Sequence, residues 1–590
     1  MSDTIGVFVA WPYANGDSHL GHVAGAYLPA DVFARYHRLK GNRVLMVSGS
    51  DSHGTPITVK AQQEGNSPRA VFERYHKEFL KGWQSLGITF DLFTHTDTEN
   101  HHEVAQRIFR KLYEQEDLYL ATEKQLYDEE VGQFLADRYV EGTCPFCAYE
   151  RARGDQCDKC GRTLDAVELQ NPRSKLSGST PVVRESKHFF LDLPVYTDRL
   201  QQYVEEQTHW RPTVRNFVRA WLKDGLKARS MTRDIKWGIP VPIPEWEHKV
   251  MYVWFEAVIG YLSASIEWAK NQGTPDAWQE WWKDDQARGY YFIGKDNTPF
   301  HTVIWGSELI AFDPELNLPY DVPANEYLNL EGDKFSTSNR WAIWLPDFLA
   351  KYDPDSLRYY LTAIAPETKD ADFTWEGFVA RNNNELVATW GNLVNRVLGF
   401  AYKRYKGTVP EPQTLDEQDQ ELLDTIAKGF ESVGQLYEQV KLRDALKEAI
   451  GLAREVNRYL DDKAPWKVYK TDRLAAGTTI YVAMRAIDSL KILLAPILPN
   501  SSQQIHDAFG YTEPLSGTQA IVTYDEETRS HDALIYEPSA SEKALINRWK
   551  PSQLQAGTPF QRTKPLFKKL DPEIIEQERA LLGTNAVVIR

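Results

Sequence analysis

IGVFVAWPYANGDSHLGH, residues 5–22, is the stretch of sequence that decides the fold. Its apolar run, residues 5–11, is followed by a proline and by turn residues, the pattern of a buried strand that ends in a turn. Asp17 and Ser18 form a good N-cap pair, and a helical pattern continues through Tyr36. We therefore expect a strand, a tight turn and the N-terminus of a helix.

Two histidines stand at the start of this predicted helix. His19 and His22 are three residues apart, so they lie on one face of the first turn. Gly21 between them leaves a flat surface for a ring or a sugar. The free N–H groups and the dipole of a helix N-terminus attract anions. The pattern predicts a phosphate and nucleotide site, and the plainer interpretation is two ordinary histidines at a helix start.

The composition sets the class of protein. A chain of 590 residues is too long for one domain, and 42% hydrophobic content with 12% aromatic residues supports well-formed cores. The N-terminus has no basic region of the kind found in secretory signals, and no apolar run approaches the roughly 20 residues of a membrane span. We therefore expect a cytoplasmic protein of several domains, with no membrane partner.

The net charge of −15 argues against a generally basic nucleic-acid binder. Any nucleic-acid binding must therefore depend on local basic patches. One basic stretch, residues 210–236, interleaves arginines and lysines with Trp210, Phe217 and Trp221. Such a face can follow a phosphate backbone. Taken alone, it is better interpreted as a solvated amphipathic helix.

Two further predicted strands end in polar residues at the same sheet edge. Residues 44–47 precede Asp51, and residues 290–293 precede Gly294 and Asp296. Ligands of open parallel sheets bind beyond the carboxyl ends of the strands. Asp51 can hold an ammonium group or cap the next helix, with equal weight. Asp296 can accept hydrogen bonds from ribose hydroxyls.

Aromatic residues surround the last of these strands in the sequence. Residues 250–261 predict a strand that runs into a helix, where Trp254 and Tyr261 can wall an apolar pocket, although such aromatics more often belong to a core. His301 and Trp305 lie one turn apart on the next predicted helix.

All four cysteines of the chain form one C-x2-C-x9-C-x2-C pattern: Cys144, Cys147, Cys157 and Cys160. Two such knuckles suit tetrahedral zinc, and disulfides are not expected in a protein without an export signal. Four thiolates leave the metal no open position, so we expect a structural zinc that folds a small inserted module.

A glycine-led loop, NLEGDKFSTSNR, occupies residues 329–340. Lys334, Ser336, Thr337 and Ser338 can hold a pyrophosphate as charge develops on it. As a single motif it is weak, and its plainer interpretation is a turn.

The remaining sequence is largely helical. Stripes at 379–405, 416–443, 445–461 and 472–495 predict an all-α bundle. Asn392, Arg396 and Trp466 can contact unstacked bases, or can simply pack within the bundle. Residues 500–590 are rich in proline and polar residues, with one charged helix predicted at 572–582.

Seven motifs in this order resemble those of the methionyl-tRNA synthetase family, aminoacyl-tRNA ligases of the Rossmann-type class. They are PYANGDSHLGH (12–22), DSHGTP (51–56), the paired CxxC insertion, YVWFEAVIGY (252–261), GKDNTPFH (294–301), KFSTS (334–338) and APW (464–466). Seven collinear motifs are far more specific than any one of them.

The resemblance implies methionine–tRNA ligase activity. The carboxylate of methionine would attack the α-phosphorus of ATP, bound with Mg, to give methionyl-adenylate and pyrophosphate. A ribose hydroxyl at the 3′ end of tRNA(Met) would then take the methionyl group. Catalysis would be positioning and charge stabilisation, without an enzyme nucleophile.

The resemblance also implies the residues of each site. The catalytic phosphate contacts are His19, His22 and Lys334, and the ATP site adds Gly21, Gly294, Asp296 and Thr337. The methionine site comprises Trp11, Tyr13, Asp51, Trp254, Ala257, Tyr261, His301 and Trp305. The CAU anticodon would be read by Asn392, Arg396 and Trp466.

Four positions depart from the family pattern. Thr337 stands where a second lysine is common, Trp11 replaces a smaller aliphatic residue, Val258 stands where proline is common, and Asn297 is polar. The chain has no room for the large editing insertion of relatives that use leucine, isoleucine or valine, so no second-sieve editing is predicted. The frequent C-terminal dimerisation domain also has no counterpart, which favours a monomer.

The expected architecture is an α/β Rossmann-type parallel-sheet catalytic domain split by a zinc-knuckle insertion and followed by an all-α anticodon-binding bundle. The domain boundaries are 1–117 and 231–325 for the catalytic halves, 118–230 for the insertion, 326–385 for the KMSKS-type loop region, 386–540 for the bundle and 541–590 for a tail that packs back on the body. Two alternatives remain: a tRNA-binding paralogue without ligase activity, and another adenylyltransferase that shares the HxGH pattern.

Overall fold

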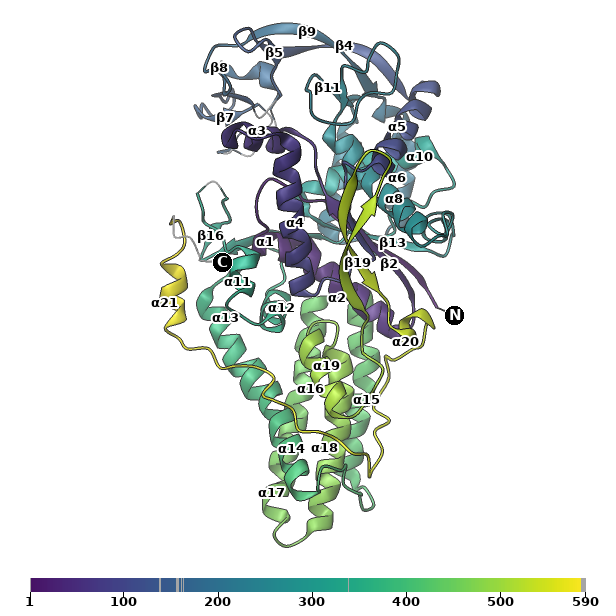
Figure 1. The fold of residues 1–590 in the computed structure, drawn as a ribbon, viewed down its shortest axis with the longest axis vertical. Coiled ribbons are helices and arrows are strands. Elements are labelled where there is room, and N and C mark those ends of the chain that lie inside the picture. Colours follow the sequence, from purple (N-terminus) through teal and green to yellow (C-terminus); the bar gives the residue numbers. More distant parts are fainter. Residues whose placement is uncertain are drawn as a thin grey trace.

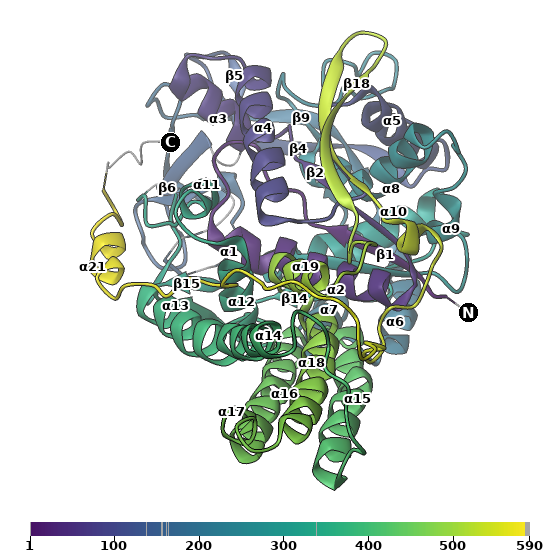
Figure 2. The ribbon, with the colours of Figure 1, turned by 60° about the horizontal axis from the view of Figure 1, so that its bottom comes forward.

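The computed structural model describes residues 2–136, 139–154, 157, 159–160, 162, 164–337 and 339–584. Figure 1 shows a broad α/β body with a column of helices extending below it. Figure 2 shows that the C-terminal segment crosses from these helices back to the body. No described helix has the length and apolar character needed to cross a membrane.

Seven described strands form the central sheet. Their order is β14 (Ala324–Asn325), β13 (Arg288–Gly294), β1 (Thr4–Val9), β2 (Arg43–Ser50), β3 (Leu92–His95), β19 (Ser530–Glu537) and β18 (Thr518–Asp525). The first five run parallel, and β19 joins β3 in the antiparallel sense. Because β1 lies between strands from opposite ends of the catalytic sequence, its carboxyl end is the crevice where such sheets bind ligands.

Helices cover both faces of this sheet, as the packing of successive residues of β1 into two different cores shows. Val7 and Val9 pack with α1 (Leu20–His22), α2 (Leu28–Lys40) and α4 (Pro68–Leu86). Phe8 packs on the other face with α5 (Glu99–Glu114), α8 (Val253–Asn271) and α10 (Trp305–Phe312). Strands buried on both faces must be apolar throughout, so the structure confirms the predicted α/β class.

The insertion is built on a long antiparallel ribbon of β4 (Leu118–Asp128) and β9 (Val182–Leu191). It also holds β5 (Gln133–Phe134), β6 (Val140–Thr143), β7 (Ala152–Arg153), β8 (Gln170–Ser174), α6 (Thr197–Glu206), α7 (Pro212–Asp224) and β10 (Arg229–Ser230). Three cations of the basic stretch, Arg215, Arg219 and Lys223, lie on α7, and Arg215 and Arg219 pair with Glu205. These two charges are thus met within the protein, in keeping with the amphipathic-helix interpretation.

Short elements complete the catalytic body. They are α3 (Thr55–Glu64), β11 (Thr232–Arg233), β12 (Val250–Met251), α9 (Gln279–Trp282), β15 (Leu328–Leu330), β16 (Asp333–Lys334), α11 (Leu345–Leu349), α12 (Pro354–Ala363) and β17 (Ala371–Phe373). Strands β16, β15 and β17 form a separate small sheet that carries the Lys334 loop.

The helical column confirms the predicted all-α bundle. It contains α13 (Trp375–Arg381), α14 (Asn392–Arg404), α15 (Glu417–Glu438), α16 (Leu442–Lys463), α17 (Pro465–Val468), α18 (Arg473–Leu494) and α19 (Pro499–Ala508). A π-helical segment, Asn382–Gly391, joins α13 to α14, so the predicted stripe at 379–405 is one continuous helix.

The segment after the bundle differs from the expectation. Residues 518–537, which the sequence places in the helical domain, form a β-hairpin that extends the central sheet beyond β3. The reason is burial: Ala533 packs in the core on one face of the sheet and Leu534 in the core on the other. Beyond α20 (Ala540–Lys543), the predicted helix at 572–582 is the shorter α21 (Ile574–Arg579), where Arg579 pairs with Glu331 at 3.0 Å.

Candidate active site

The first helix begins one residue later than predicted. His19, and not the Asp17–Ser18 pair, is the N-cap of α1. Residues around Ser18 are held extended, because the Ser18 carbonyl accepts a hydrogen bond from the Leu345 N–H at 2.8 Å and His19 pairs with Trp344 in an antiparallel bridge. This tertiary pairing corrects the sequence-based cap assignment.

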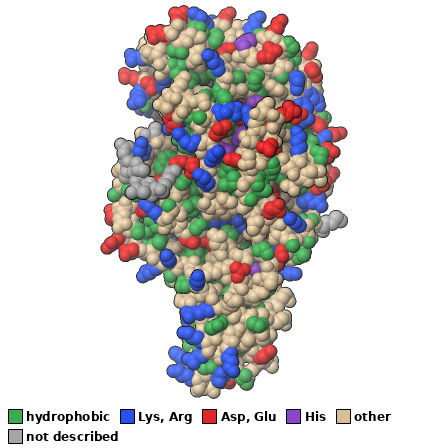
Figure 3. Space-filling view, in the orientation of Figure 1, with side chains coloured by type: hydrophobic (Ala, Val, Ile, Leu, Met, Phe, Trp, Pro, Cys, Tyr) green, Lys and Arg blue, Asp and Glu red, His purple; other side chains and the backbone are tan. Residues whose placement is uncertain are grey.

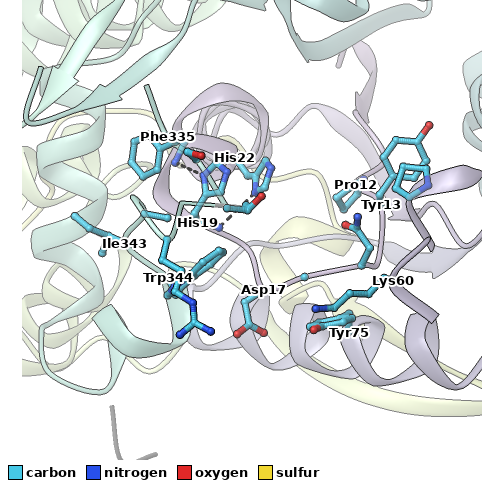
Figure 4. A pocket seen from close by; sticks show the side chains of 18 of the residues that line it. Pro12, Tyr13, Asp17, His19, His22, Lys60, Tyr75, Phe335, Ile343 and Trp344 are labelled. Atoms are coloured by element: carbon cyan, nitrogen blue, oxygen red, sulfur yellow. Dashed lines mark hydrogen bonds between the residues drawn. The ribbon is translucent and has the colours of Figure 1, made fainter. Parts of the chain in front are cut away.

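His19 and His22 lie side by side in the wall of the cleft (Figure 4). His19 Nδ1 accepts from the Gly21 N–H at 3.1 Å, and His22 Nδ1 accepts from the His19 N–H at 3.3 Å. Since each Nδ1 acts as an acceptor, the hydrogen of each neutral ring is assigned to Nε2. The two rings stack with their centroids 3.7 Å apart, so the two imidazoles act from the same place in the cleft wall.

Both imidazoles are neutral near pH 7. Burial lowers the pKa of His19 well below its ordinary value, and the neighbouring His22 lowers it further. Burial lowers the pKa of His22 to about 4. Neutral donors bind an uncharged or weakly charged group only modestly, and their hydrogen bonds strengthen as negative charge develops on the acceptor.

The KFSTS loop closes against this histidine turn. The Phe335 ring stacks on the His19 ring with centroids 4.8 Å apart, and its edge lies near Gly21. Ser336 and Trp341 exchange two backbone hydrogen bonds of 2.9 Å, which fixes the loop as a tight hairpin. The predicted phosphate contact Ser338 lies outside the described residues.

Lys334 lies beside the predicted ribose site. Its Nζ is 5.2 Å from the centre of the Tyr327 ring, a cation–π contact. The Tyr327 hydroxyl donates to both carboxylate oxygens of Asp296 at 2.7 Å. Sequence reasoning missed Tyr327, because a lone tyrosine in a linking segment carries no local signal.

A cavity of about 2180 Å³ joins these elements. The predicted site residues that line it are Trp11, Tyr13, His19, Gly21, His22, Trp254, Gly294, Asp296 and Thr337. The predicted residues Lys334, Asp51, Ala257, Tyr261, His301 and Trp305 are not on its wall. The cavity is also lined by Tyr149 and Arg151 of the knuckle and by Leu581 and Leu582 of the tail. Their local sequence gives no signal of this position.

Aromatic rings form one end of this cavity. Tyr13 meets Trp254 edge to face at 6.1 Å, and Trp254 stacks on Phe300 at 4.4 Å. Phe300 lies inside the GKDNTPFH motif, but the sequence analysis did not single it out. Tyr13 and Trp254, the two of these rings that line the cavity, give it an apolar aromatic wall suited to an unbranched thioether side chain.

Trp11 fits only because two glycines face it. A Cβ added at Gly49 would lie 2.2 Å from the Trp11 ring, and one at Gly260 would lie 2.7 Å from it. The large ring thus occupies volume that side chains at these two positions would otherwise fill. Two glycines opposite an unexpected tryptophan are the sequence signal that was missed.

A hydrogen-bonded pair lies below the aromatic wall. The Tyr261 hydroxyl and His301 Nε2 are 2.6 Å apart, and His301 Nδ1 is 2.8 Å from the Asn297 carbonyl. Burial lowers the pKa of His301 to about 4, so this neutral ring donates from Nδ1 and accepts the tyrosine proton. Trp305 is fully buried and its Nε1 donates to the Tyr291 hydroxyl at 3.1 Å.

Asp51 lies beneath Tyr13, with which it forms a parallel bridge. Its carboxylate accepts the His53 N–H at 3.1 Å, and the His53 ring reaches Glu256 of α8 at 2.8 Å. Burial, together with the charge of Glu256, raises the pKa of Asp51 well above its ordinary value. Glu256 also contacts His101 at 2.9 Å, so a buried polar network backs the helix that carries Trp254 and Ala257.

The four cysteines converge. Cys144 and Cys160 sulfurs are 3.9 Å apart, Cys147 and Cys157 sulfurs are 3.5 Å apart, and all four lie within 4.8 Å of one another. Sulfurs at the corners of a tetrahedron with zinc bonds of about 2.3 Å lie about 3.8 Å apart. These separations fit one metal ion and far exceed the roughly 2.05 Å of a disulfide.

The far end of the bundle brings together the predicted base-contacting residues. The Arg396 guanidinium lies 4.8 Å above the Trp466 ring, and Arg396 pairs with Asp461 at 3.5 Å. Asn392 precedes Arg396 by one turn on α14 and is exposed. Trp466 lies on the short helix α17, and its ring is half-buried. Figure 3 shows several Lys and Arg side chains gathered at this end.

Comparison with known proteins adds independent findings. Residues 5–398 match the family described as tRNA synthetases class I (M), and residues 409–523 match the anticodon binding domain of methionyl tRNA ligase. The chain is 62% identical to the methionine–tRNA ligase of Thermomicrobium roseum, over 99% of each chain. It is 52% identical to that of Roseiflexus, again over 99% of each. A solved Mycobacterium tuberculosis methionyl-tRNA synthetase in complex with methionyl-adenylate shares the fold, with a TM-score of 0.75, 24% identity, and coverage of 96% of this chain and 100% of that one.

Proposed function

The chain belongs to the methionyl-tRNA synthetase family, and from that premise we propose that it is a methionine–tRNA ligase whose adenylate forms in the cleft between the histidine turn and the KFSTS loop. A carboxylate oxygen of methionine attacks the α-phosphorus of ATP, the bond to the bridging oxygen breaks, and pyrophosphate leaves. A ribose hydroxyl at the 3′ end of tRNA(Met) then attacks the acyl carbon and AMP leaves.

The histidine turn supplies the main donors in this proposal. His19 and His22 line the cleft as neutral rings with their hydrogens assigned to Nε2, so these donors would stabilise phosphate oxygens most when charge builds up on them. Gly21 and Gly294 leave room for the nucleotide, Asp296 accepts the ribose hydroxyls, and Lys334 and Thr337 contact the leaving pyrophosphate. Magnesium bound with ATP would offset part of the charge of the phosphates.

The aromatic end of the cavity holds methionine in this proposal. Trp11, Tyr13 and Trp254, which line the cavity, enclose the thioether, and the buried residues Ala257, Tyr261, His301 and Trp305 support this wall. Asp51 receives the ammonium group. At the far end of the bundle, Asn392, Arg396 and Trp466 contact the CAU anticodon by stacking and edge contacts.

The remaining assignments complete the proposal. Cys144, Cys147, Cys157 and Cys160 hold a structural zinc that cross-links the inserted module. The domains keep the sequence-based boundaries, except that the hairpin at 518–537 belongs with the catalytic sheet. The enzyme acts as a monomer in the cytoplasm, where thiols stay reduced.

The observation that carries the proposal is that His19 and His22, each with Nδ1 as a hydrogen-bond acceptor, line a cleft shared with the KFSTS loop. Amino-acid-dependent pyrophosphate exchange, measured with each of the twenty amino acids, tests it, and methionine alone should support rapid exchange. His22→Ala should lower the exchange kcat by about 10²-fold to 10³-fold, the usual effect of removing one such donor. Methionine affinity should change little, and equal losses in both would contradict the role of His22.

A further inference from the structure

The C-terminal hairpin reaches the back of the proposed methionine site. Its turn carries Arg529, whose Nη1 lies 3.1 Å from a carboxylate oxygen of Asp97, at the end of the parallel strands. In Figure 1 this hairpin, β18–β19, lies alongside the strands of the catalytic sheet, although about 430 residues separate it from Asp97 in sequence.

Asp97 is a buried charge with four partners. Arg69 contacts it at 2.7 Å, Arg529 at 3.1 Å, His102 Nε2 at 3.3 Å and His53 Nε2 at 3.6 Å. Burial opposes ionisation, but the nearby His102 and His53 rings and the charge of Arg529 hold the pKa of Asp97 well below its ordinary value. Asp97 is therefore a carboxylate whose position depends on the cations around it.

His53 connects Asp97 to the wall of the proposed methionine site. One ring nitrogen faces Asp97, and the other lies 2.8 Å from Glu256. The second oxygen of Glu256 is 2.9 Å from His101, whose ring lies 6.3 Å from that of Trp11. The His53 backbone N–H also donates to Asp51, so one histidine contacts both the helix of the aromatic wall and the proposed ammonium ligand.

His53, Asp97 and His102 lie close enough to hold a metal ion, but the chain already supplies the charge that an ion would bring. Two guanidinium groups, from Arg69 and Arg529, contact the same Asp97 oxygen. Both guanidinium groups would repel a divalent cation bound at this place. The cluster is therefore better explained as a salt-bridge network.

We propose that Arg529 is a positioning residue for the amino-acid site: the C-terminal hairpin holds Asp97, Asp97 orients His53, and His53 fixes Glu256 and Asp51 behind the methionine pocket. The inference rests on the proposed function of that pocket. The C-terminal hairpin would thus contribute to methionine binding in a pocket built largely from the N-terminal part of the chain.

The hairpin has other attachments, so Arg529 is not needed to dock it. Glu526 accepts from the Glu99 N–H at 2.7 Å, and Glu99 accepts from the N–H groups of Glu527 and Thr528 at 2.9 Å. The Asp532 carbonyl lies 2.7 Å from His76 Nε2. Removing the guanidinium should therefore disturb the Asp97 network while the hairpin stays in place.

The test is Arg529→Ala in the full-length chain, with methionine-dependent pyrophosphate exchange as the readout. We expect the KM for methionine to rise about tenfold, corresponding to about 1.4 kcal/mol, with the KM for ATP and kcat changed by less than about twofold. Arg529→Lys, which keeps the positive charge, should recover most of the affinity.

Lys77→Ala is the matched control, because Lys77 pairs with Asp532 of the same hairpin at 3.7 Å and is exposed. It should leave both KM values unchanged. If Arg529→Ala does not fold, Arg529→Met keeps the apolar stem and answers the same question.

A wild-type KM for methionine in the folded Arg529 variant would overturn the inference, as would an equal rise in both KM values that Arg529→Lys does not reverse. If the unmodified protein itself shows no methionine-dependent exchange, the proposed function fails instead.

Discussion

Replacing Gly260 with alanine tests whether Trp11 forms the wall of the methionine site. The new Cβ would lie 2.7 Å from Cε2 and Cζ2 of Trp11 and 3.1 Å from its Nε1. Carbon atoms in contact prefer about 3.5–4.0 Å, so the ring must shift by roughly 1 Å. Gly49 faces the ring at even shorter range, and the free direction is therefore toward the cavity that Trp11 lines.

The energy of this shift sets the expected effect. Overpacking of this kind costs about 1–3 kcal/mol, while alanine in a helix is favoured over glycine by about 1 kcal/mol. Global stability should therefore change by no more than about 2 kcal/mol. The intruding ring should raise the KM for methionine in pyrophosphate exchange about tenfold, or 1.4 kcal/mol, and leave the KM for ATP within about twofold.

Gly399→Ala is a suitable control, because Gly399 lies inside helix α14 and a Cβ there would meet no atom within 4 Å. Combining Gly260→Ala with Trp11→Leu should restore much of the methionine affinity, since the smaller side chain accepts the new methyl group. An unchanged KM for methionine in Gly260→Ala, or a double variant no better than the single one, would refute the assignment of Trp11.

Three further results are expected. Adenylation should be nearly independent of pH between about 6 and 8 and should fall toward pH 4, because the pKa of His22 is lowered to about 4. A loss of adenylation rate already between pH 7 and 6 would contradict this role of His22. The same lowered pKa means that neutral His22 contributes its full stability to the fold above its unfolded pKa of about 6.5. That contribution is lost as the pH falls to about 4. Metal analysis should find one zinc per chain, and chelation should speed proteolysis within residues 140–165; metal-free protein with unchanged proteolysis would reject the site. Trp466→Ala should raise the KM for tRNA(Met) about 10-fold to 100-fold through lost stacking and leave pyrophosphate exchange unchanged, whereas unaltered tRNA kinetics would rule out the anticodon role.

Local sequence signals predicted the parts of the fold that depend on local physics. The strand at residues 5–11 is β1, because a run of apolar residues before a turn is buried wherever the sheet forms. The helical stripe at 416–443 is α15, with a capping box at Asp416 that needs no tertiary contact. The cysteine pattern likewise fixes its own geometry, since the two knuckles need only a short connection to meet.

Features created by distant segments escaped the sequence analysis. Ser18 looks like a cap, but its carbonyl pairs with Leu345, more than 300 residues away, and the helix starts at His19. Strand β19 of the hairpin at 518–537 buries residues on both of its faces, and its place beside β3 depends on the pairing of Leu534 with Phe93. A period-two pattern can show that a strand exists, but not which edge it joins.

Asp51 shows how the structure can argue against one of two interpretations of equal weight, here the helix cap, while the other stays a prediction. The sequence left it as either a cap for the next helix or a ligand for an ammonium group. Helix α3 has Gly54 as its N-cap, with no side-chain hydrogen bond, and the Asp51 carboxylate accepts instead from the His53 N–H. In the described part of the chain it forms no salt bridge with Lys or Arg, and burial together with Glu256 raises its pKa. A buried carboxyl group in this state regains its charge most readily when a cation binds beside it, which is what the ammonium group of an amino acid provides.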